Sequence, residues 1–89
     1  METIEIYFDK IKGTAHIIES NNLYSLWKIV VDEKYLIIKN SYIREETYTL
    51  VEYSNDVDLK KATEQVPVIM WQIEQFIKDK RPRPPKRYR

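Results

Sequence analysis

The residues best equipped for chemistry in this sequence are the cations at its C-terminus. Between Lys78 and Arg89 there are seven basic side chains and one acidic one, a net charge of +6, whereas residues 1–77 carry −5. Lys and Arg side chains at this density neutralise nucleic-acid phosphates, and a tyrosine among them can stack on a base. The residues predicted to make these contacts are Lys80, Arg81, Arg83, Lys86, Arg87, Tyr88 and Arg89.

Three prolines determine the conformation expected for this arm. Pro82, Pro84 and Pro85 remove backbone donors and hold φ at about −65°. Residues 80–89 are therefore predicted to form a flexible, extended basic tail. Such a tail could instead only solubilise the protein, or lie across the acidic body of a neighbouring subunit. Residues 82–87 also match the pattern P-x-x-P-x-R and a basic nuclear-localisation cluster, but both patterns are short.

A second group of candidate binding residues alternates along the strands expected in the body of the chain. Tyr24 and Lys28 are predicted on the sheet face opposite the core, where bases could stack on rings while cations follow phosphates. The same alternation places Tyr7, His16 and Tyr48 on that face, and leaves the side of Tyr35 and Lys39 open. The alternative is an ordinary solvated or dimer-buried sheet face, since tyrosine favours strands.

The composition excludes most catalytic and metal-binding chemistry. The chain has no cysteine, one histidine and one glycine, which excludes disulfides, thiolate zinc sites and glycine-rich phosphate loops. His16 has ordinary strand neighbours, so a structural or surface role is expected. Glu45 and Glu46 could hold a divalent ion with Asp32 or Glu33 only if the fold brought them together. We expect a protein without enzymatic activity, metal or cofactor.

Length and hydropathy bound the domain organisation. Eighty-nine residues, 43% apolar and 33% charged, supply one hydrophobic core. Residues 1–5 lack the features of a signal peptide, and no apolar stretch approaches the roughly 20 residues that span a bilayer. We expect a single soluble domain over residues 1–79, located in the cytoplasm and without membrane contact.

Alternating apolar and polar residues predict five strands joined by short connections. The expected strands cover residues 3–8, 14–19, 23–31, 35–39 and 47–53. The expected turns cover residues 10–13, 20–22 and 32–34, and a polar connection covers residues 40–46. Consecutive short strands of this kind predict an antiparallel meander.

A change of period after residue 53 predicts one long helix. Its apolar stripe consists of Leu59, Ala62, Val66, Ile69, Ile73 and Phe76. Asn55 or Asp56 could cap its N-terminus. Because the stripe keeps its phase across Pro67, a kink is favoured over a restart there.

These elements predict an α+β domain, a five-stranded sheet with one long C-terminal helix packed on one face. Met70 and Trp71 lie off the main stripe, which favours a homodimer built through the helix or a sheet edge. A strongly curved sheet that wraps both flanks of the helix is the alternative.

The charge distribution supports two functional hypotheses. The first is a small non-enzymatic protein that binds DNA or RNA with weak sequence selectivity, mainly through the cationic arm. The second is a protein-interaction or inhibitor module, of the phage or mobile-element type, that acts through its acidic body or a sheet edge.

Overall fold

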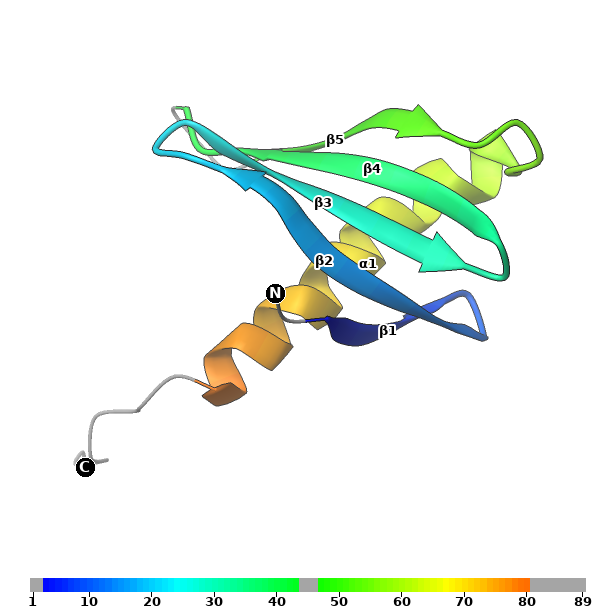
Figure 1. The fold of residues 1–89 in the computed structure, drawn as a ribbon, viewed down its shortest axis with the longest axis horizontal. Coiled ribbons are helices and arrows are strands. Elements are labelled where there is room, and N and C mark those ends of the chain that lie inside the picture. Colours follow the sequence, from blue (N-terminus) through cyan, green and yellow to red (C-terminus); the bar gives the residue numbers. More distant parts are fainter. Residues whose placement is uncertain (1–2, 44–46, 81–89) are drawn as a thin grey trace.

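A computed structural model of the chain describes residues 3–43 and 47–80, and the predicted arm beyond Lys80 lies outside the described residues. Five strands precede one helix (Figure 1). Their bounds are β1 Ile4–Phe8, β2 Ile11–Ser20, β3 Tyr24–Val31, β4 Lys34–Ser41, β5 Thr47–Tyr53 and α1 Leu59–Lys80. The strands form one antiparallel sheet in sequence order. The predicted α+β meander with a single C-terminal helix is confirmed.

Two-residue turns join the first two strands and the central two strands. Asp32 and Glu33 both have positive φ, 52° and 66°, which is the backbone of a type I′ hairpin turn. The predicted reversal at this point is confirmed. The turn predicted over residues 10–13 is wrong, because Phe8 already pairs with Ile11 and Gly13 lies inside β2.

Gly13 belongs to a strand because its neighbours leave no room for a side chain. A Cβ atom there would lie 2.5 Å from Val31 Cγ2 and 2.6 Å from the Val30 carbonyl oxygen. Gly13 lies in β2 on the core face of the sheet, paired with Ile6 of β1 on one side. On its other side the backbone of β3 is too close to leave room for a side chain. A close approach of backbones, and not a turn, accounts for the one glycine.

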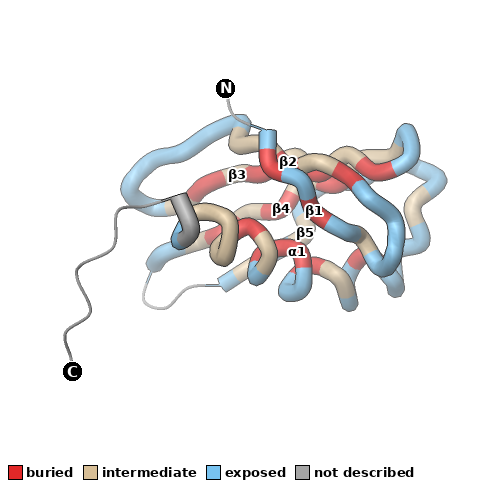
Figure 2. Tube along the Cα trace, turned by 90° about the horizontal axis from the view of Figure 1, so that it is seen from below, coloured by how far each residue is buried: buried red, intermediate tan, exposed pale blue. Residues whose placement is uncertain are grey.

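The core lies between the inner face of the sheet and α1, as the red segments of Figure 2 show. Alternate strand residues such as Ile6, Ile29 and Ile38 are fully buried. Ile69 and Ile73 cover them from the helix. Buried Ser25 is satisfied, since its Oγ accepts hydrogen bonds from the Tyr42 hydroxyl at 2.9 Å and from Trp27 Nε1 at 3.2 Å.

The helix differs from its sequence-based prediction at its first turn. Asp58 is the N-cap, with its Oδ1 accepting from the Lys61 amide at 3.2 Å, so the cap predicted at Asn55 or Asp56 is wrong. Leu59, predicted on the apolar stripe, is 49% exposed. Beyond it α1 is continuous through Pro67, so the helix does not restart there. Thr63, whose carbonyl loses its helical donor to Pro67, is exposed and can bond water.

Two glutamines of α1 close the outer edge of β1. The Tyr7 amide donates to Gln72 Oε1 and Gln72 Nε2 donates back to the Tyr7 carbonyl, both at 2.8 Å. Seven residues earlier, Gln65 Oε1 accepts from the Asp9 amide at 2.9 Å. Seven residues are about two helical turns, so both side chains lie along one flank of α1. They occupy backbone groups that an edge strand would otherwise offer to another chain.

The opposite flank of α1 reaches the other edge strand. The Tyr48 hydroxyl in β5 donates to Glu74 Oε2 at 2.5 Å. A helix bonded to both edges of a five-stranded sheet requires the sheet to curve around it. Met70 is accordingly buried, whereas its neighbour Trp71 is 60% exposed.

Candidate functional site

The sheet face turned away from α1 gathers most of the predicted stacking residues. Its members follow from the register, in which His16 pairs with Lys28 and neither lies on the core face. Figure 1 shows that no element of the described chain covers this side of the central strands. We call it the open face, and its tyrosines, lysines and histidine are Tyr7, Lys12, His16, Tyr24, Lys28, Tyr35 and Lys39.

The structure decides the positions that the alternation left open. Tyr35 and Lys39 join Tyr24 and Lys28 on the open face, because two residues in the β3–β4 turn fix the register of both strands. Tyr48 was predicted on this face and is not there. It pairs with buried Asn40 and packs against the core, because a bulge in β5 reverses the alternation between Leu50 and Glu52 and leaves Tyr48 on the core face.

The first cluster on the open face is centred on Tyr24. Lys39 Nζ lies 4.7 Å from the centre of the Tyr24 ring, and the Tyr24 hydroxyl donates to Glu19 Oε2 at 2.6 Å. Asn21, in the β2–β3 turn, accepts from the Tyr24 amide at 3.0 Å and from the Leu23 amide at 2.8 Å. A turn is present as predicted but covers residues 21–23, because Ser20 still pairs with Ser25 as the last residue of β2, and the turn holds the first residue of β3 in place.

The second cluster has the same composition as the first, but its lysine comes from β3 and its tyrosine from β4. Lys28 Nζ in β3 lies 5.3 Å from the centre of the Tyr35 ring in β4. The Tyr35 hydroxyl donates to Glu52 Oε2 in β5 at 2.7 Å. The open face therefore presents two Glu–Tyr–Lys groups, with the tyrosines and lysines from the β3–β4 hairpin and the glutamates from β2 and β5, and the tyrosines are about six residues or 20 Å apart along the strand.

The carboxylates keep both phenols protonated. The hydrogen bond to Glu19 raises the pKa of Tyr24 above its ordinary value of 10.0, and the bond to Glu52 does the same for the pKa of Tyr35. A neutral ring under an ammonium group retains the electron-rich face that binds cations, worth about 0.5–1 kcal/mol at an exposed site. The clusters order two rings and two ammonium groups on one surface without any buried charge.

The three lysines of the open face differ in whether a carboxylate neutralises them. Lys12 Nζ forms an ion pair with Glu5 at 2.8 Å, and the hydrogen bond to Glu5 raises the pKa of Lys12. Lys28 and Lys39 have no ion-pair partner among the described residues. These two ammonium groups are the ones on this face that can meet an anion without first breaking a salt bridge.

Of the seven predicted arm residues, the structure describes only the backbone of Lys80, which is in the last turn of α1. Arg81, Arg83, Lys86, Arg87, Tyr88 and Arg89 lie outside the described residues. The end of α1 is near the Tyr24 cluster along the sheet, because Ile77 and Lys78 line one hollow with Trp27 and Asn40 from β3 and β4. That hollow has a volume of about 370 Å³.

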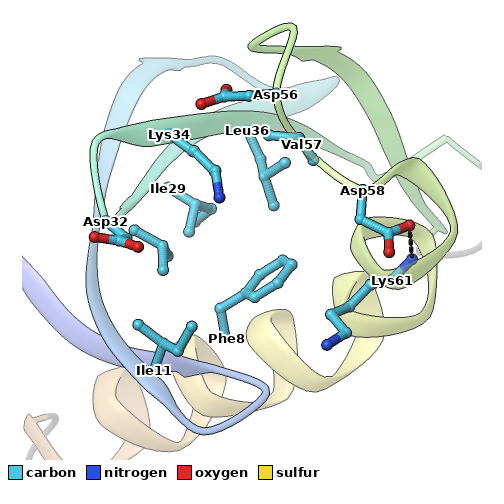
Figure 3. Close-up of a pocket in the computed structure, with 11 residues that line it drawn as sticks. Phe8, Ile11, Ile29, Asp32, Lys34, Leu36, Asp56, Val57, Asp58 and Lys61 are labelled. Atoms are coloured by element: carbon cyan, nitrogen blue, oxygen red, sulfur yellow. Dashed lines mark hydrogen bonds between the residues drawn. The ribbon is translucent and has the colours of Figure 1, made fainter.

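A second hollow opens at the other end of the sheet–helix layer (Figure 3). Phe8, Leu36 and Val57 form its apolar wall, and Asp32 and Lys34 are among the charged residues at its rim. Its volume is about 200 Å³. Ligand sites usually have about 300–1,000 Å³, so this hollow is the open end of the core and not a site for a small molecule of ordinary size.

The described residues contain neither a cluster of metal-ligating side chains nor a membrane-spanning helix. No group of three or more His, Asp or Glu side chains in residues 3–43 and 47–80 could hold a metal ion. Glu45 and Glu46, considered above as ligands, lie outside the described residues. The helix of the described chain is too polar to cross a membrane.

Comparison with protein families, with curated proteins and with solved structures finds no match for this chain.

Proposed function

We propose that this protein is a non-enzymatic nucleic-acid-binding protein that acts as a homodimer. The cationic arm from Lys80 to Arg89 supplies most of the phosphate contacts, and the open face supplies a second, weaker surface. The observation that carries the proposal is the division of charge, with +6 in residues 78–89 against −5 in the rest of the chain. Contacts of this kind position the protein without reading sequence, so binding is weakly selective.

The open face supports the proposal through Tyr24 and Lys28, together with Lys39 and Tyr35. The backbones of Lys28 and Lys39 are about two residues apart on neighbouring strands, but their side chains diverge, each ammonium group lies on the ring of its own cluster, and neither is neutralised by an ion pair with another described residue. Each tyrosine ring has a lysine on it, so a base that stacks there must displace the lysine, which is then available for a phosphate. Single strands, which expose their bases, are the preferred substrate of this surface.

The geometry allows the arm and the open face to meet one strand. Both the end of α1 and the Tyr24 cluster are at the end of the sheet where β3 begins. Nine residues follow Lys80, and nine residues reach at most about 30 Å. That length exceeds the thickness of a two-layer domain, so the arm can contact a strand that lies on the open face.

The experiment is fluorescence anisotropy of labelled single- and double-stranded oligonucleotides at several salt concentrations. The wild type is compared with a full-length variant in which the six arm cations, Lys80, Arg81, Arg83, Lys86, Arg87 and Arg89, are replaced by Gln. We expect this variant to lose most of the affinity and to flatten the logarithmic salt dependence by roughly 0.9 per lost phosphate contact on duplex DNA. Unchanged affinity in the Gln variant would refute the role of the arm.

The open face is tested separately with Lys28→Ala combined with Lys39→Ala. We expect a smaller loss, greater for single strands than for duplexes. Lys12→Ala is the matched control, because Lys12 is on the same face but already paired with Glu5. Equal effects of the double variant and the control would remove the open face from the proposal.

Binding of a protein partner is the second candidate function, and the hydrogen bonds at the sheet edges limit where a partner could add a strand. Gln72 occupies the outward amide and carbonyl of Tyr7, and Gln65 the amide of Asp9 just after β1, so β5 offers the less obstructed edge to a partner that adds a strand. β5 is mostly exposed but has a bulge opposite the step from Ile37 to Ile38, which opposes continuous pairing. A pull-down whose captured protein survives nuclease treatment and the Gln substitutions in the arm would favour this function over the first.

A further inference from the structure

The outward side of α1 carries an apolar group that the sheet does not cover. Trp71 is 60% exposed and Val68 45% exposed, and Pro67 beside them is also exposed. The curvature of the sheet accounts for the burial of Met70 and leaves Trp71 in solvent. Tryptophan is among the residue types most enriched at the energetic centres of protein interfaces, so this group has the composition of an interface centre.

Two charges of opposite sign lie on either side of Trp71. Glu64 is seven residues before it and Lys78 seven residues after it, and both are exposed. Seven residues are about two turns and 10 Å of helix, so the three exposed residues follow one another along the outer side of α1, with Lys78 at the border of the hollow that it lines with Trp27 and Asn40. Neither charge takes part in an ion pair with another described residue.

We propose that a second copy of this chain docks on this line, with the two α1 helices antiparallel and Trp71 at the two-fold axis. This arrangement sets Glu64 opposite Lys78 of the partner subunit, and symmetry repeats the pair on the other side of the axis. A parallel arrangement would set each charge opposite its own kind. The line is therefore complementary to itself in one orientation only.

The geometry of packed helices fits these pairs. Helices that cross at about 20° with axes 8–10 Å apart diverge by only about 4 Å at 10 Å from the crossing point. Glu and Lys side chains are long enough to bridge that separation. Val68 and Pro67 flank the axis and would exclude water from the two indole rings.

The proposed interface also defines where the two arms begin. Lys80 is nine residues from Trp71, so in the antiparallel pair the two helix ends are roughly 27 Å apart, at 1.5 Å per residue. The inference names the interface of the homodimer included in the proposed function. It does not depend on nucleic acid, because self-association and oligonucleotide binding are measured separately.

The test is analytical ultracentrifugation of the full chain over a wide concentration range. We expect a monomer–dimer equilibrium that Trp71→Ala weakens at least about 30-fold. Tyr7→Ala is the control, since Tyr7 is 51% exposed on the open face. A wild type that stays monomeric at all concentrations, or a dimer that Trp71→Ala does not weaken, would overturn the proposal.

Charge exchange tests the orientation. Glu64→Lys alone and Lys78→Glu alone should each weaken the homodimer about tenfold, because each sets like charges opposite each other twice. The double exchange should restore the affinity, and an equimolar mixture of the two single variants should form the heterodimer in preference to either homodimer. Glu33→Lys, in the exposed β3–β4 turn, is the matched charge control. Failure of both the double exchange and the mixture to recover affinity would refute the antiparallel pairing.

Discussion

The closure of β1 by Gln72 predicts a measurable loss of stability in Gln72→Ala. The side chain makes two hydrogen bonds of 2.8 Å with the backbone of Tyr7. Each hydrogen bond contributes about 0.5–1.5 kcal/mol net. Because Tyr7 is half exposed, water can replace the lost partner, which places the effect in the lower part of that range. We expect a decrease of about 1–2 kcal/mol in the free energy of unfolding for the two bonds together.

The matched control is Gln75→Ala, three residues further along the same helix. Gln75 is also partly exposed and makes no hydrogen bond to the described part of the sheet. The change in helix propensity and side-chain size is the same for both variants. The difference between the two variants isolates the bonds to Tyr7. With a urea dependence of about 1 kcal/mol per molar, the midpoint of Gln72→Ala should fall by about 1–2 M relative to Gln75→Ala.

Hydrogen exchange supplies an independent measurement on the same bond. The Tyr7 amide donates to Gln72 Oε1 in the wild type and should be protected, and Gln72→Ala should abolish that protection. Amides in the central strands should change only through the global loss of stability. Equal midpoints for the two alanine variants, together with unprotected Tyr7 in the wild type, would refute the closure of this edge.

Four further variants test the fold and the open face. Gly13→Ala should destabilise by about 1–3 kcal/mol in urea unfolding, because its Cβ would overlap the Val30 carbonyl oxygen. Met70→Ala should cost about 2–5 kcal/mol, since the side chain is 1% exposed. Glu33→Gly should stabilise by about 0.5–1 kcal/mol, because relief of positive φ exceeds the entropy that glycine adds to the unfolded chain. The raised pKa values of Tyr24 and Tyr35 mean that their stabilising effect is complete below pH 10 and is lost as pH rises through the folded-state pKa. Spectroscopic titration should therefore show two late phenols, absent when both are replaced by Phe.

The sequence predicts the order of the elements well because each signal is local. Alternation along β3 and β4 and a two-residue turn at Asp32 and Glu33 are sufficient to predict the central hairpin. The prediction of a turn at Gly13 is wrong because the signal there is not local. Glycine signals either a turn or a close approach of two strands, and the second depends on Val30 and Val31, which are distant in the sequence.

Edge effects account for the other differences between prediction and structure. The side of Tyr48 depends on the bulge in β5, and the burial of Met70 depends on how far the sheet curves around the helix. Neither property can be predicted from the spacing of apolar residues in the sequence. The roles of Gln65 and Gln72 could have been suspected from their seven-residue spacing, but their partners are 56 and 65 residues away in the chain.

The four sides of α1 explain why an interface on its outer line is consistent with the rest of the fold. One side packs on the core, Gln65 and Gln72 hold one sheet edge, and Glu74 holds Tyr48 at the other. A substitution on any of these sides disturbs the sheet. Glu64 and Trp71, on the outward line, are free of that constraint, because both are exposed and neither makes a hydrogen bond or ion pair with the described part of the sheet. Lys78 also borders the hollow beside Trp27 and Asn40. Variants of Glu64 and Trp71 should therefore change self-association without changing the stability of the folded chain, which separates a docking role from a structural one.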